Sequence, residues 1–109
     1  MKVEYHFTIK PAGEPWPKYH YRVSARKIVN AQSVPRKGDW IHAHEDFGGD
    51  RIKDVYWTVG DDTAFVESEM TLQRDEFKSV LEKMRDNGYE VNADKEVTQL
   101  IEEWAEDSK

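Results

Sequence analysis

The sequence predicts an α+β domain: about five strands, forming an antiparallel sheet or a small barrel, followed by two C-terminal helices. Three observations lead to this prediction. Apolar and polar residues alternate through most of the first 70 residues, Gly, Pro and Asp separate the alternating runs, and from residue 73 onward apolar residues recur at helical spacing. A length of 109 residues fits one domain, 1–109, with strands within 2–70 and helices at about 73–87 and 93–106.

The first two strands are predicted on either side of a proline-rich loop. Residues 2–9 alternate without a break, which is typical of a half-buried strand. Residues 10–18 hold three of the four prolines and cannot form a central strand. Trp16 stands between two of these prolines, so we expect it in a stiff, extended loop where its ring is exposed. Alternation resumes over residues 19–29.

The stretch from Ser33 to Met70 predicts three further antiparallel strands. They are expected at 40–44, 51–59 and 63–70, separated by a Gly-Gly loop and by a Gly-Asp-Asp turn. The strand at 51–59 is apolar on both faces, which favours a central position with both faces covered. This stretch is therefore predicted to be the scaffold on which the helices pack.

The period of the pattern changes to that of helices near residue 73. Each predicted helix has four apolar residues on one stripe: Phe77, Val80, Leu81 and Met84, then Val97, Leu100, Ile101 and Trp104. Gly88 is a suitable C-cap for the first helix, and Asn92 a suitable N-cap for the second. Residues 89–91 are predicted to be a simple link.

Composition excludes several classes of protein. The chain has no Cys, so disulfides and thiolate chemistry are excluded, and it has no apolar run long enough to span a membrane. We find no export signal, which favours a cytoplasmic location. There is no Gly-x-Ser-x-Gly motif and no glycine-rich phosphate loop, so we expect neither an enzyme nor a resident cofactor.

Two histidines in the predicted strand at 40–44 could form part of a metal site. Because residues two apart on a strand point to the same side, His42 and His44 could both bind one divalent metal ion. A third ligand would come from His6, His20 or Glu45. Two histidines on a solvated strand face explain the same spacing.

Aromatic and basic residues together raise a second alternative, a small barrel that binds single-stranded nucleic acid. The residues that would form this surface are Trp16, Lys18, Tyr19, Tyr21, Arg22, Arg26, Lys27, Arg36, Lys37 and Trp40. The overall net charge of −6 argues against this alternative, because nucleic-acid-binding domains are usually basic.

The uneven distribution of charge favours a protein partner. Residues 61–109 carry fifteen Asp and Glu against six Lys and Arg, whereas residues 1–60 have a small basic excess. An acidic helical face can attract a basic partner, and exposed aromatic residues often dominate binding energy. An ordinary solvated helix face would have the same composition. The predicted contact residues are Trp16, Trp40, Glu102, Glu103, Glu106 and Asp107.

One short run resembles a pattern of phage and prophage proteins. Residues 34–41 read Val-Pro-Arg-Lys-Gly-Asp-Trp-Ile, and Val-Tyr-Trp-Thr-Val follows at 55–59. This is similar to small phage-encoded β-domain proteins in which a Pro-Arg-x-Gly-Asp run leads into a strand. The resemblance implies an accessory protein of a mobile element, with no catalytic residues to transfer. The predicted function is thus a small non-enzymatic accessory protein that binds a protein partner.

Overall fold

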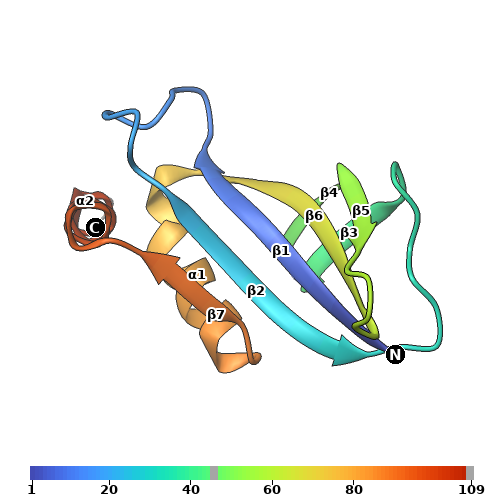
Figure 1. The fold of residues 1–109 in the computed structure, drawn as a ribbon. Coiled ribbons are helices and arrows are strands. Elements are labelled where there is room, and N and C mark those ends of the chain that lie inside the picture. Colours follow the sequence, from blue (N-terminus) through green and yellow to red (C-terminus); the bar gives the residue numbers. More distant parts are fainter. Residues whose placement is uncertain (45–46, 108–109) are drawn as a thin grey trace.

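The computed structural model describes residues 1–44 and 47–107. All of its helices follow residue 72. In sequence order its elements are β1 (Lys2–Pro11), β2 (Val23–Asn30), β3 (Trp40–His44), β4 (Phe47–Arg51), β5 (Asp54–Trp57), β6 (Thr63–Leu72), the 3-10 turn η1 (Arg74–Glu76), α1 (Phe77–Asp86), β7 (Glu90–Ala93) and α2 (Lys95–Asp107). The predicted α+β class with two C-terminal helices is confirmed (Figure 1).

Five strands form one open, mixed sheet in the order β5-β6-β1-β2-β7. The central strand, β1, pairs antiparallel with β2 but parallel with β6, where Lys2 lies opposite Thr63. The prediction of a purely antiparallel sheet, or of a closed barrel, is therefore wrong. The physical reason is that alternation shows which residues share a face of a strand but not the direction of its neighbour, and here β6 runs antiparallel to β5 and parallel to β1.

The predicted run of three antiparallel strands is correct only for its last pair, since β5 and β6 are antiparallel neighbours but the first strand pairs with neither. The strand at Trp40–His44 exists, but it pairs with β4 in a separate two-stranded sheet. The predicted central strand at 51–59 is divided between β4 and β5, and β5 is an edge strand. Apolar residues on both of its faces do not reflect burial, since Trp57 is 52% exposed and Val59 lies wholly in solvent.

Only one face of the five-stranded sheet is covered. The odd-numbered side chains of β1 point to this face, where Phe7 and Ile9 pack with the two helices and Val3 packs with Ile52 beside the β3–β4 hairpin. In Figure 1 the helices lie at the β7 end of the sheet and the β3–β4 hairpin at the β5 and β6 end. The core is therefore formed by one sheet face with two separate covers.

The helices follow the predicted apolar stripes, with small changes at their ends. Gln73 and Glu76 form a capping box, so the predicted helix at 73–87 begins as the 3-10 turn η1 before it continues as α1. The second helix is capped by Asp94, whose carboxylate accepts a hydrogen bond from the Val97 amide. The predicted N-cap Asn92 lies instead in β7, a short edge strand at a place where the sequence predicts only a link between the helices.

Candidate functional site

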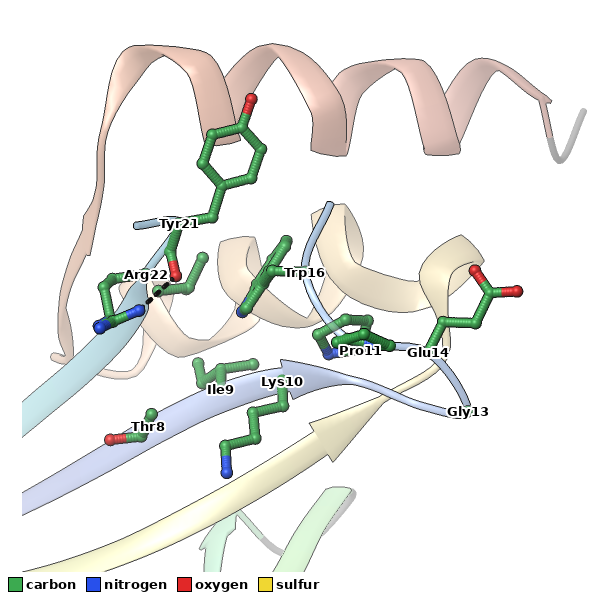
Figure 2. Close-up of a pocket in the computed structure, with 11 residues that line it drawn as sticks. Thr8, Ile9, Lys10, Pro11, Gly13, Glu14, Trp16, Tyr21 and Arg22 are labelled. Atoms are coloured by element: carbon green, nitrogen blue, oxygen red, sulfur yellow. Dashed lines mark hydrogen bonds between the residues drawn. The ribbon is translucent and has the colours of Figure 1, made fainter. Parts of the chain in front are cut away.

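A large cavity lies where β1 ends, β2 begins and the proline-rich loop joins them (Figure 2). Its volume is about 520 Å³, which is within the usual range for ligand pockets. The apolar part of its lining is Ile9, Pro11, Pro15, Trp16, Tyr21 and Val23, and the charged part is Lys10, Glu14 and Arg22. A mainly apolar wall with a few charged groups at its edge is typical of a binding site.

Trp16 forms one wall of this cavity. Its ring stacks on Trp104 of α2, with 5.7 Å between ring centroids, and meets Phe77 of α1 edge-on at 5.4 Å. Trp16 is therefore half-buried, whereas the sequence suggested an exposed ring. The two flanking prolines hold the loop in a shape that folds the ring back onto the helices. This contact joins two predicted contact regions, because Trp16 now lies against the helix that carries the acidic residues.

The charged side chains around the cavity differ in how they are neutralised. Lys10 donates a hydrogen bond to Glu69 at 2.8 Å, and Glu14 accepts one from Arg74. Arg22 instead donates from one terminal nitrogen to two backbone carbonyls, those of Tyr19 at 2.7 Å and of Tyr21 at 3.1 Å. Arg22 thus lines the cavity, and the groups to which it donates are uncharged.

The acidic side of α2 lies next to Tyr21. Burial raises the pKa of the Tyr21 hydroxyl, and the neighbouring carboxylates of Glu96, Asp94 and Glu103 raise it further. Glu96 also lies 3.9 Å from Lys18 and 3.6 Å from His20, both in the loop. Acidic side chains of α2 therefore lie beside Tyr21, and Arg22 lines the cavity as a cation without a carboxylate partner among the described residues.

The four acidic residues predicted as contacts are all exposed on α2, but they face different neighbours. Glu102 accepts a hydrogen bond from Lys78 of α1 at 2.8 Å, and the pKa of Lys78 is raised mainly by that bond. Glu103 acts on Tyr21, on the cavity side. Glu106 and Asp107 lie in the last turn of the helix. Glu103 therefore lies near Tyr21, one residue of the cavity lining, whereas Glu102 is turned toward α1.

Trp40 lies far from Trp16, on the outer side of the β3–β4 hairpin. It is 58% exposed, and its indole N–H donates to Nε2 of His42 at 2.8 Å. The Arg51 guanidinium lies 5.9 Å from its ring centroid. The rings of Trp40 and His42 both lie over Gly49 of β4, where an added Cβ would be 2.6 Å from the Trp40 indole nitrogen. Trp40 is thus engaged in covering a bare stretch of backbone.

The histidine pair is not joined by the other predicted ligands. Within residues 1–44 and 47–107, no three His, Asp or Glu side chains are grouped closely enough to hold a metal ion. His6 is hydrogen-bonded to Glu4, and His20 lies beside Glu96. The remaining predicted ligand, Glu45, lies outside the described residues.

The predicted basic and aromatic surface is dispersed over the fold. Tyr21 and Trp16 point into the core region around α2, whereas Trp40 lies on the hairpin. Arg26 faces the uncovered side of the sheet, where two of its nitrogens donate to Glu90. The structure does not gather these residues on one surface.

The uncovered sheet face carries a cluster that sequence reasoning missed. Glu4 is only 8% exposed there, hydrogen-bonded to His6 at 2.5 Å and 3.8 Å from Arg26. The sheet register places it between Phe65 of β6 and Ile28 of β2. Alternation in β1 indicated that Glu4 and His6 share a face, but not which side chains would cover them.

Comparisons with known proteins give no relative: no protein-family model, no curated protein and no solved structure matches the chain. In the part of the chain that the structure describes, neither helix is long and apolar enough to cross a membrane.

Proposed function

We propose that this protein is a non-enzymatic binding protein that captures a polypeptide partner at the Trp16 cavity. The partner inserts an apolar side chain into the cavity and places basic residues beside α2. The observation that carries the proposal is the position of the cavity, whose Trp16 wall is stacked directly on the acidic helix.

The cavity suits an apolar anchor. Hot spots of protein interfaces are apolar or aromatic groups that fill well-packed pockets surrounded by polar residues. Trp16 is already held by Trp104 and Phe77, so its ring loses little freedom when a partner binds. A rigid aromatic wall of this kind provides contact area at low entropic cost.

The charge around the cavity favours a basic partner. Tyr21 lines the cavity, and the pKa of its hydroxyl is raised by the nearby carboxylates of Glu96, Asp94 and Glu103. Complementary charge speeds the encounter of two proteins and determines which partner is accepted, and both effects weaken as salt increases. We therefore expect partner capture to be faster and tighter at low ionic strength.

The proposal can be tested with peptides selected from a displayed random library on the wild-type protein. The affinity of each selected peptide is then measured for Trp16→Ala and for Trp57→Ala, which removes an exposed tryptophan from the opposite end of the sheet. Trp16→Ala should weaken binding by about thirtyfold or more, since hot-spot truncations cost at least about 2 kcal/mol. Trp57→Ala should leave the affinity unchanged.

A charge-reversal variant tests the electrostatic part. Glu103→Lys should slow association and reduce its dependence on salt, whereas Glu67→Lys, on the uncovered sheet face, should do neither. Circular dichroism and urea unfolding establish that each variant is folded. Selected peptides that bind Trp16→Ala as tightly as the wild type would reject the cavity as the binding site.

A further inference from the structure

We infer that the partner binds through its C-terminus: its terminal carboxylate pairs with Arg22 while its last side chain, an apolar one, fills the cavity. This inference rests on the proposed function and specifies which part of a polypeptide the cavity receives. It follows from the charge state, the position and the fixed orientation of Arg22.

Arg22 is the cation at the cavity that has no carboxylate partner among the described residues. Lys10, which also lines the cavity, is paired with Glu69, and Arg74 at the cavity edge is paired with Glu14. Arg22 donates only to backbone carbonyls, and only from its NH1 nitrogen. The other terminal nitrogen and Nε have no hydrogen-bond partner among the described residues, and this edge of a guanidinium binds a carboxylate in a bidentate manner.

The Arg22 guanidinium is held in place before any ligand binds. The carbonyls that it contacts belong to the turn in which the Tyr21 amide donates to the Lys18 carbonyl at 3.0 Å. Because two hydrogen bonds already fix the side chain, a carboxylate that binds it pays little of the usual ordering cost. A mobile surface arginine would not have this advantage.

The arrangement also determines the direction of the partner chain. Figure 2 shows the Tyr21 ring extending toward α2, while the Arg22 guanidinium lies on the other side of the Tyr21 backbone. A carboxylate at Arg22 therefore leaves the preceding residues of the partner to approach α2. Basic residues just before an apolar C-terminal residue would then lie near Glu96 and Glu103.

The experiment uses three probes: acetyl-Lys-Lys-Leu with a free carboxylate, the same peptide as its C-terminal amide, and acetyl-leucine. Binding is followed by NMR at the indole N–H of Trp16 and the guanidinium of Arg22. We expect the free acid to shift both signals and to bind about tenfold more tightly than the amide, because a bidentate charge-assisted pair is lost in the amide. Acetyl-leucine should bind more weakly than the free-acid peptide, because it has no basic residues.

Matched arginine variants separate the carboxylate contact from general charge. Arg22→Gln should remove the preference for the acid, whereas Arg26→Gln, which removes an equal charge on the uncovered sheet face, should preserve it. Equal affinity for acid and amide, or a preference that survives in Arg22→Gln, overturns the inference and leaves the proposed function intact. If acetyl-leucine binds as tightly as the acid peptide, the inference that the ligand is the C-terminus of a polypeptide is overturned. If no probe shifts the Trp16 signal, the C-terminal inference fails, and the selected peptides decide the proposed function separately.

Discussion

Gly49 provides a sharp test of how the β3–β4 hairpin is built. An alanine Cβ at this position would lie 2.6 Å from the indole nitrogen of Trp40 and 2.8 Å from Cε1 of His42. Real Cβ atoms do not approach other atoms so closely. Both neighbours are rigid rings, so Gly49→Ala forces the two side chains off the strand and breaks the hydrogen bond between them.

Two opposing effects determine the size of the change. Overpacking costs about 1–3 kcal/mol, whereas replacing Gly by Ala where the backbone permits it gains about 0.4–1 kcal/mol from the unfolded state. The gain is available because Gly49 does not have a positive φ. Trp40 is more than half exposed and can rotate into solvent, so the cost falls near the lower limit. We expect Gly49→Ala to destabilise the protein by about 0.5 kcal/mol.

Urea unfolding of four proteins, the wild type and three variants, completes the test. Gly49→Ala is compared in the wild type and in a background where Trp40 and His42 are both alanine, so that the clash is absent. In that background the substitution should become neutral or stabilise by about 0.5 kcal/mol. An equal cost in both backgrounds would show that the rings do not lie over Gly49, and the reasoning would be refuted.

Two further substitutions test contacts in the core and on the sheet. Tyr89→Phe should lower the free energy of unfolding by about 1.5 kcal/mol, because the Tyr89 hydroxyl donates to the buried carbonyl of Ala43 and links the end of α1 to the hairpin; a change below about 0.5 kcal/mol in urea unfolding would contradict this role. Hydrogen bonds from Lys10 and Lys53 hold the pKa of Glu69 below its ordinary value of 4.5. Its contribution to stability is therefore complete above that value and is lost as the pH falls through the lower folded pKa. Glu69→Gln should flatten the loss of melting temperature on the acidic side of about pH 4.5, and an unchanged acid profile would count against the pairing.

The local pattern of the sequence predicts the faces of the strands and helices well. Alternation in β1 places Val3, Phe7 and Ile9 inward, and all three are buried. The four apolar residues of the α1 stripe are buried as well, because a period of 3.6 defines a helix face without reference to distant residues. These predictions succeed since they require only neighbours along the chain.

Strand order was not predictable in the same way. Alternation shows which face of a strand is apolar, but it contains nothing about which strand lies beside it or in which direction. The apolar residues on both faces of 51–59 suggested a central strand, whereas Tyr56 stacks on Phe65 on the uncovered face of the sheet. An edge strand with aromatic residues on two sides gives the same sequence pattern as a central strand.

The cavity could be predicted only in part. The prolines around Trp16 indicated a stiff loop, but not that the loop would fold back onto Trp104. The role proposed for Arg22 depends on its hydrogen bonds to two backbone carbonyls and on its having no carboxylate partner among the described residues, and neither has a signature in the sequence. The cavity lining lies between Thr8 and Val23, but Trp16 is held in place by Phe77 and Trp104, which only the fold brings beside it.

The parallel pairing of β1 with β6 has a consequence for how the chain folds. The β1–β2 pair joins neighbouring segments and can form early, but the other edge of β1 must wait for a strand some sixty residues further along, since Lys2 lies opposite Thr63. Until β6 arrives, that edge is open to any other extended chain. Folding should therefore be slow for a protein of this size, and crowding of nascent chains should favour aggregation through β1. Pairing with β6 is thus what closes the open edge of β1, the strand at the centre of the sheet.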